Sequence, residues 1–112
     1  MTLEEIITRL QLTPLTAPRP AASIFPNGGY TCDLLSCAMA GAQRGSVWVT
    51  LQAHLNIIAI AALLELSAII ITENAQPDPA TLQKAQEQGV TLLSTPLDSY
   101  EISGKLWELG LR

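Results

Sequence analysis

Three short, almost wholly apolar segments limit what this chain can fold into. They are Val47–Leu51, Ala68–Thr72 and Val90–Leu93, and a segment of helical character stands between each pair. Apolar runs of about four to eight residues are typical of strands buried on both faces, and their alternation with helices indicates β-α-β units. The sequence therefore predicts an α/β fold with three layers, in which a mostly parallel sheet of four to five strands is flanked by helices.

Each predicted helix begins with a residue that is suited to capping. The starts are Thr2 for residues 3–11 (a capping box with Glu5), Thr31 for a helix ending near Gly41, Asn56 for Ile57–Leu66, Asp78-Pro79 for a helix closed by Gly89, and Thr95-Pro96 for a last helix to about Leu109. A further short strand is expected near Ser23–Pro26, followed by a turn at Asn27–Gly29. Residues 1–22 are interpreted as an N-terminal helix and a proline-rich connector, and residues 23–112 as the α/β domain, together forming a single compact domain.

Composition excludes some partners. The net charge is −4 and no cluster of lysine or arginine exists, so a nucleic-acid binder that follows phosphates is not expected. No membrane contact is expected either, because Glu65 interrupts the apolar stretch 55–72, and its longest run, Ile57–Leu64, is far short of the roughly 20 residues that a crossing needs. The acidic, amphipathic N-terminus does not resemble a signal peptide, which favours a cytoplasmic location. Cys32 and Cys37 are interpreted as small buried thiols.

Polar residues gather where the predicted strands end. Gln52, His54 and Asn56 follow one strand, Ser94 and Thr95 follow another, and Gly28-Gly29 is expected to follow a third. Open α/β sheets bind ligands along the carboxyl edge, where strand order reverses, and helix N-termini there offer N–H groups to an anion. We therefore predict one shared ligand-binding crevice, lined by Gly28, Gly29, Gln52, His54, Asn56, Ser94 and Thr95.

Simpler interpretations stand beside these. His54 can be a structural or capping contact, a hydrogen-bond partner of a ligand, or a general base, and Gly28-Gly29 can be a tight turn or a phosphate contact. Neither a P-loop nor a G-x-G-x-x-G motif is present, and a single histidine without paired thiols does not suit a metal. The sequence predicts no cofactor, no metal and no assigned catalytic residue.

Several segments resemble the DRTGG domain family. They are GGYTCDLLS, WVTLQAHLNI and LLSTPLDSYEISGKLWELGL, and the resemblance covers about residues 23–110, although the Asp-Arg-Thr-Gly-Gly string itself is absent. The resemblance implies a small α/β domain similar to the N-terminal domain of HPr kinase/phosphorylase. It also implies a regulatory or sensing role without established catalysis, in a chain that stands alone or accompanies CBS, phosphotransacetylase or kinase modules.

The functional prediction is a non-catalytic regulatory or sensing domain. It binds a small anionic or nucleotide-like ligand, a partner protein, or both; the alternative is a small enzyme that uses His54 at the carboxyl edge. A homodimer is also predicted, because the segment Ile57–Leu64 is apolar on all sides and a helix of that kind must be buried all round. The interface is expected near this helix or near the helix of Trp107.

Overall fold

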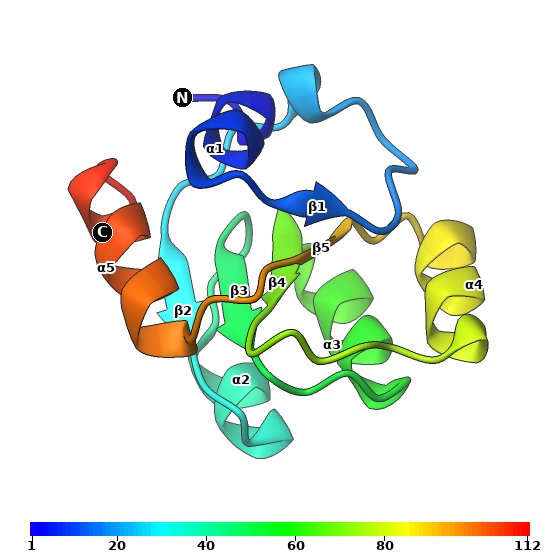
Figure 1. Cartoon of the computed structure of the whole chain (residues 1–112). Helices are drawn as coiled ribbons and strands as arrows, with labels where there is room; N and C mark the ends of the chain where they lie inside the picture. The colour runs from blue at the N-terminus through cyan, green and yellow to red at the C-terminus, as the bar shows by residue number, and fades with distance from the viewer.

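A sheet of five strands lies between two layers of helices in the computed structural model, which describes residues 1–112 (Figure 1). The strands are β1 (Thr13–Pro14), β2 (Gly29–Thr31), β3 (Val47–Thr50), β4 (Ala68–Ile71) and β5 (Leu92–Ser94). Their order is β1-β5-β4-β3-β2, with β2 to β5 parallel and β1 antiparallel to β5. The predicted three-layer α/β fold with a mostly parallel sheet is confirmed.

The apolar strands supply both faces of the core. Because successive side chains point to opposite faces of a sheet, Trp48 and Ile69 pack on one side and Val49 and Ile70 on the other. All four are fully buried. This two-sided burial explains why the segments are apolar at every position rather than at alternate ones.

The helices are divided between the two faces. They are α1 (Leu3–Leu10), α2 (Leu35–Gly41), α3 (Asn56–Leu64), α4 (Pro79–Gln88) and α5 (Ser99–Glu108), with a short 3₁₀ helix η1 (Ala21–Ser23). The parallel strands β2 to β5 are neighbours in sequence order, so right-handed crossovers place α2, α3 and α4 on the same face. The opposite face is covered by α1 and α5 (Figure 1).

Two of the predicted helix starts are confirmed. Thr2 and Glu5 form a reciprocal capping box at α1. The Asp78 carboxylate accepts the backbone N–H of Thr81 (2.8 Å) at α4, which ends at Gly89 in the left-handed conformation (φ 73°).

The other three predicted caps are wrong, although α3 begins at Asn56, within one residue of its predicted start. Thr31 belongs to β2, where its hydroxyl lies 2.7 Å from that of Ser103, and α2 begins after Leu34 without a side-chain cap. Asn56 makes no capping bond, and the Nδ1 of His54 accepts the Asn56 backbone N–H instead (3.3 Å). The Thr95 hydroxyl accepts the N–H of Leu97 in a local turn, so α5 begins later, with Asp98 as its cap.

The position of β2 corrects another expectation. Residues 23–26 form no strand. The strand expected there, β2, begins only at Gly29, in register with Val47. Gly28-Gly29 therefore leads into a strand rather than following one. The expected connector also contains β1, and the Thr16 hydroxyl accepts from Leu92 N–H (3.0 Å) and donates to the Val90 carbonyl (2.8 Å).

The apolar helix α3 is enclosed mainly by its own chain. It packs on the sheet between α2 and α4, so Ile57, Ile58 and Ala61 are buried, while Ala59 and Leu63 face outward. No helix of the protein is both long and apolar enough to span a bilayer.

Candidate functional site

The carboxyl edge of the sheet is organised by Asp33, in the loop after β2. One carboxylate oxygen accepts the hydroxyl of Thr50 and the backbone N–H of Leu51, each at 2.9 Å. Gln52 also binds Asp33, since its side-chain amide donates to the Asp33 carbonyl (3.0 Å). These bonds hold the loops after β2 and β3 together, and they use the side-chain amide of Gln52 in a contact within the protein.

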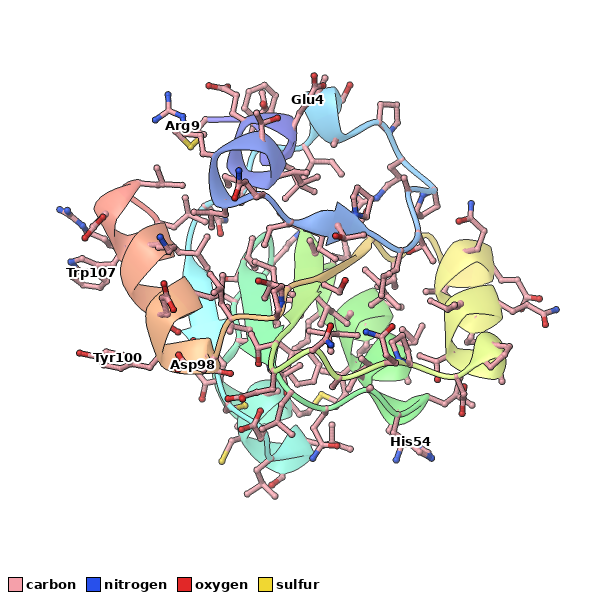
Figure 2. The ribbon with its side chains drawn as sticks, viewed as in Figure 1. Glu4, Arg9, His54, Asp98, Tyr100 and Trp107 are labelled. Carbon is pink, nitrogen blue, oxygen red and sulfur yellow. The ribbon has the colours of Figure 1, made fainter.

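His54 lies on the outside of the same edge (Figure 2). Its Nδ1 is used in the contact with the N–H of Asn56, which caps the first turn of α3. In a catalytic histidine this nitrogen usually carries the proton donated to an orienting carboxylate. Of the three interpretations of His54, the observed contact therefore supports the structural or capping one.

Ser94 and Thr95 lie at the same edge, at the end of β5. Both are buried, and Thr95 is held by backbone bonds to β4 and to the loop after it: its N–H donates to the Ile71 carbonyl, and its carbonyl accepts from Asn74. The structure thus brings Gln52, His54, Asn56, Ser94 and Thr95 to one edge as expected. It does not bring Gly28 and Gly29 there, because Gly28 precedes β2 and Gly29 begins it, so both lie at the amino edge.

The charge at the carboxyl edge does not suit an anion. The loops there carry Asp33, Glu73, Asp78 and Asp98, whereas the lysines and arginines are all elsewhere. Asp78 and Asp98 also accept N–H groups of α4 and α5 that a bound anion would otherwise use. These bonds hold the pKa of the Asp78 carboxyl below its usual value, chiefly through the backbone and side chain of Thr81.

Strand order offers no crevice at that edge either. The predicted crevice requires a point where the order of parallel strands reverses, and no reversal occurs along β2-β3-β4-β5. All the helices that connect these strands lie on one face.

A polar hollow of about 490 Å³ lies at the opposite, amino edge. It is lined by Asn27, Gly28, Gly29, Gln43, Arg44, Ser46 and Arg112. Asn27 is fixed by its side-chain amide, which donates to the Arg44 carbonyl (2.9 Å). Arg44 and Arg112 are the two cationic residues of this lining, and guanidinium groups are the donors that recognise phosphate and carboxylate.

Both arginines in this hollow are positioned by neighbours. Arg44 forms an ion pair with Glu65 (2.8 Å), and both side chains are well exposed, so the pair is easily exchanged for another anion. Arg112 donates from Nε to the Trp107 carbonyl (3.2 Å), and its guanidinium lies 5.3 Å from the centre of the Trp107 ring. The backbone carbonyl of Arg112 faces Gly28 across the hollow.

A second, more apolar hollow adjoins the first. It has a volume of about 120 Å³ between β2 and α5, and it is lined by Gly29, Thr31, Val49, Ser103, Leu106, Trp107 and Leu111. Gly29 borders both hollows, and the Trp107–Arg112 contact links them. Trp107 projects from the outer side of α5 (Figure 2).

Sequence reasoning missed Asp33, Arg44 and Arg112. Asp33 carried a usable signal, because an aspartate between a strand and a helix commonly accepts backbone N–H groups. The arginines carried none, since they are far apart in the sequence and only the fold places them beside Gly28-Gly29.

The thiols and acidic groups do not form a further chemical centre. No three histidine, cysteine, aspartate or glutamate side chains are arranged to hold a metal ion. Both cysteines are free; Cys32 is half-buried, which raises its pKa through desolvation, whereas Cys37 is exposed, contrary to the expected burial.

Comparisons with known proteins agree on one domain type. The family model of the DRTGG domain matches residues 39–109. A structure of the CBS and DRTGG domains of the regulatory region of Clostridium perfringens pyrophosphatase, complexed with the activator diadenosine tetraphosphate, is similar in fold with a TM-score of 0.74 and 19% identity. The match covers 92% of this chain and 44% of that chain, so the protein spans less than half of the compared region. No curated protein sequence matches.

Proposed function

Because this chain belongs to the DRTGG domain family, we propose that it is a regulatory domain without catalytic activity of its own, which senses a small anionic, nucleotide-like ligand. The proposal is supported by the pyrophosphatase region of similar fold, which was crystallised with a nucleotide activator. It also agrees with the sequence, which offered one candidate base and no partner for it.

The observation that carries the proposal is the junction of two unlike hollows at Gly29. Arg44 and Arg112 are among the residues that line one hollow, and Trp107 is among those that line the other. A nucleotide needs both features, because its phosphates bind guanidinium groups and its base stacks on an aromatic ring. We therefore assign the ligand site to Gly28, Gly29, Arg44, Trp107 and Arg112.

The carboxyl-edge residues have a different role in this proposal. Gln52, His54, Asn56, Ser94 and Thr95 hold loops and a helix start in place, and the acidic side chains around them disfavour an anion. A homodimer remains part of the proposal, since side chains as large as Leu34 and Leu63 are more than half exposed. Any partner protein, and a location in the cytoplasm, are expectations that accompany this role.

Calorimetric titration of the full chain tests the site. ATP is expected to bind more tightly than either adenosine or tripolyphosphate, since only ATP occupies both hollows. Arg112→Ala should weaken ATP binding by about tenfold or more, the value of one charge-assisted contact. Arg9→Ala is the matched control, because Arg9 lies on α1, away from both hollows (Figure 2).

Two results would overturn the assignment. One is the absence of heat and of thermal stabilisation with ATP, adenosine and tripolyphosphate at millimolar concentration. The other is unchanged ATP affinity in Arg112→Ala and in Trp107→Ala, which would move the ligand site elsewhere.

A further inference from the structure

The outer face of the helix pair α2 and α3 is uncharged. Neither helix contains a lysine, arginine, aspartate or glutamate, although helices that cover a sheet normally present such residues to water. Four large apolar side chains on or beside the pair are exposed: Leu63 (68%), Leu34 (61%), Met39 (42%) and Leu55 (39%). An uncharged face with several exposed apolar side chains is typical of an interaction surface.

The two ends of the pair differ in charge. Asp33 lies at the end where α2 begins, whereas at the other end Arg44, which follows α2, is ion-paired with Glu65, which follows α3. The same polarity extends over the molecule, with Glu73, Asp78 and Asp98 at the carboxyl edge and Arg19 and Arg112 at the amino edge. Both helices run in the same direction, from the acidic end to the basic end, because both connect parallel strands.

The uncharged face and the different charges of its ends favour a second copy of this chain as the partner. A highly charged macromolecule gains nothing from a neutral face, whereas a second copy of this chain buries the same apolar side chains from both sides. A two-fold axis lying in the interface, perpendicular to the helices, sets each acidic end against the basic end of the other copy. It also makes the helices of one copy antiparallel to those of the other, so the dipoles of the two helix pairs oppose favourably.

We propose that the α2–α3 face is the dimer interface of this protein, and that it binds the same face of a second copy with the helices antiparallel. This assignment rests on the homodimer proposed above and names its surface. Leu63 lies in the outward stripe of α3, near its C-terminal end, and is buried by the contact, and Asp33 of each copy lies near Arg44 of the partner subunit.

Light scattering of the full chain during size exclusion, at about 50 μM, tests the proposal. The unmodified chain should be a dimer. Leu63→Glu should be a monomer with an unchanged circular dichroism spectrum, because its side chain is 68% exposed and contributes little to the monomer core. Tyr100→Glu is the matched control, since Tyr100 is 90% exposed on α5, on the other face of the sheet (Figure 2).

A second variant, Asp33→Asn, tests whether the helices of the two copies are antiparallel. Asp33→Asn keeps an oxygen for the Thr50 and Leu51 contacts and removes only the charge. It should raise the dissociation constant a few-fold if the helices are antiparallel, whereas a parallel pair would bring two Asp33 carboxylates together and the variant would bind more tightly.

Each outcome has a distinct meaning. A monomeric unmodified chain would overturn both the homodimer and this interface, and would leave the ATP titration as a separate question. A dimer that survives Leu63→Glu but dissociates in Tyr100→Glu would place the interface on α5. A tighter dimer in Asp33→Asn would reject the antiparallel arrangement.

Discussion

At the scale of single residues, a few carboxylates order the carboxyl edge of this sheet. Asp33 binds a hydroxyl and a backbone N–H from the neighbouring loop, and Asp78 and Asp98 cap the helices α4 and α5. Each of these oxygens satisfies a donor that would otherwise be left open near the surface. Their common effect is an edge that is stable and negatively charged without a bound ligand.

Asp78 makes the stability of the fold depend on pH. Its pKa is lowered in the folded protein by the bonds from Thr81, so the ionised form favours the folded state. The stabilisation is complete above the unfolded pKa of about 3.9 and is lost as pH falls through the lower folded value. Asp78→Ala should therefore lower the urea midpoint at pH 7, and the difference from the unmodified chain should shrink towards pH 2.5. Glu108→Gln serves as a control, and a difference that stays constant with pH would contradict the explanation.

At the scale of elements, two glycines inside helices have opposite surroundings. Gly41 ends α2 where a β-carbon would lie 2.6 Å from the ring of Tyr30, whose hydroxyl donates to the Cys37 carbonyl. Gly104, in α5, has no atom within 4 Å of that position. Helix propensity favours alanine at both sites, so packing alone separates them.

Alanine substitution should therefore change stability in opposite directions at these sites. Gly104→Ala is expected to stabilise the protein by about 0.5–1 kcal/mol, the usual gain within a helix. Gly41→Ala should destabilise it by roughly 1–3 kcal/mol, because Tyr30 must move and strain its surroundings. Urea unfolding of both variants measures the difference, and stabilisation by Gly41→Ala would show that Tyr30 moves without cost.

At the scale of the whole molecule, the N-terminal segment is part of the core rather than an appendage. Leu3 and Ile6 are fully buried on the inner side of α1, and Leu12, just before β1, is 5% exposed. They belong to the same apolar cluster as Val49 and Ile102. The segment therefore covers one face of the sheet, although the DRTGG model match begins only at residue 39.

Deletion of residues 1–22 should prevent folding. Losing the burial of three large apolar side chains costs roughly 5–9 kcal/mol, which is comparable with the total stability of a domain of this size. Leu3→Ala is the milder comparison and should cost about 2–5 kcal/mol while the chain still folds. Dispersed amide signals in the NMR spectrum of the deleted chain would show that residues 23–112 form an independent domain.

The sequence by itself determined the layers and the buried strands. Apolar runs such as Ala68–Thr72 report local burial on both faces, and caps such as Thr2 and Asp78 act within three residues, so both kinds of signal are contained in short segments. The family resemblance also came from the sequence and is confirmed. Cap assignments failed where the helix boundary differed from the predicted one: α3 already includes Asn56, so the Asn56 side chain makes no capping bond, and the Nδ1 of His54 accepts the Asn56 backbone N–H.

Only the tertiary structure decided which residues meet. Gly28-Gly29 was assigned to the wrong edge because a short strand rich in glycine has no apolar pattern to fix where it begins. Strand order then determined that α2, α3 and α4 share one face, which encloses most of α3 and leaves no reversal of strand order among β2 to β5. Arg44, Trp107 and Arg112 come together beside Gly29 only through the pairing of β2 with β3 and the return of α5 across the sheet. Pairing of this kind depends on contacts between distant segments, and these contacts leave no signal in any short stretch of the chain.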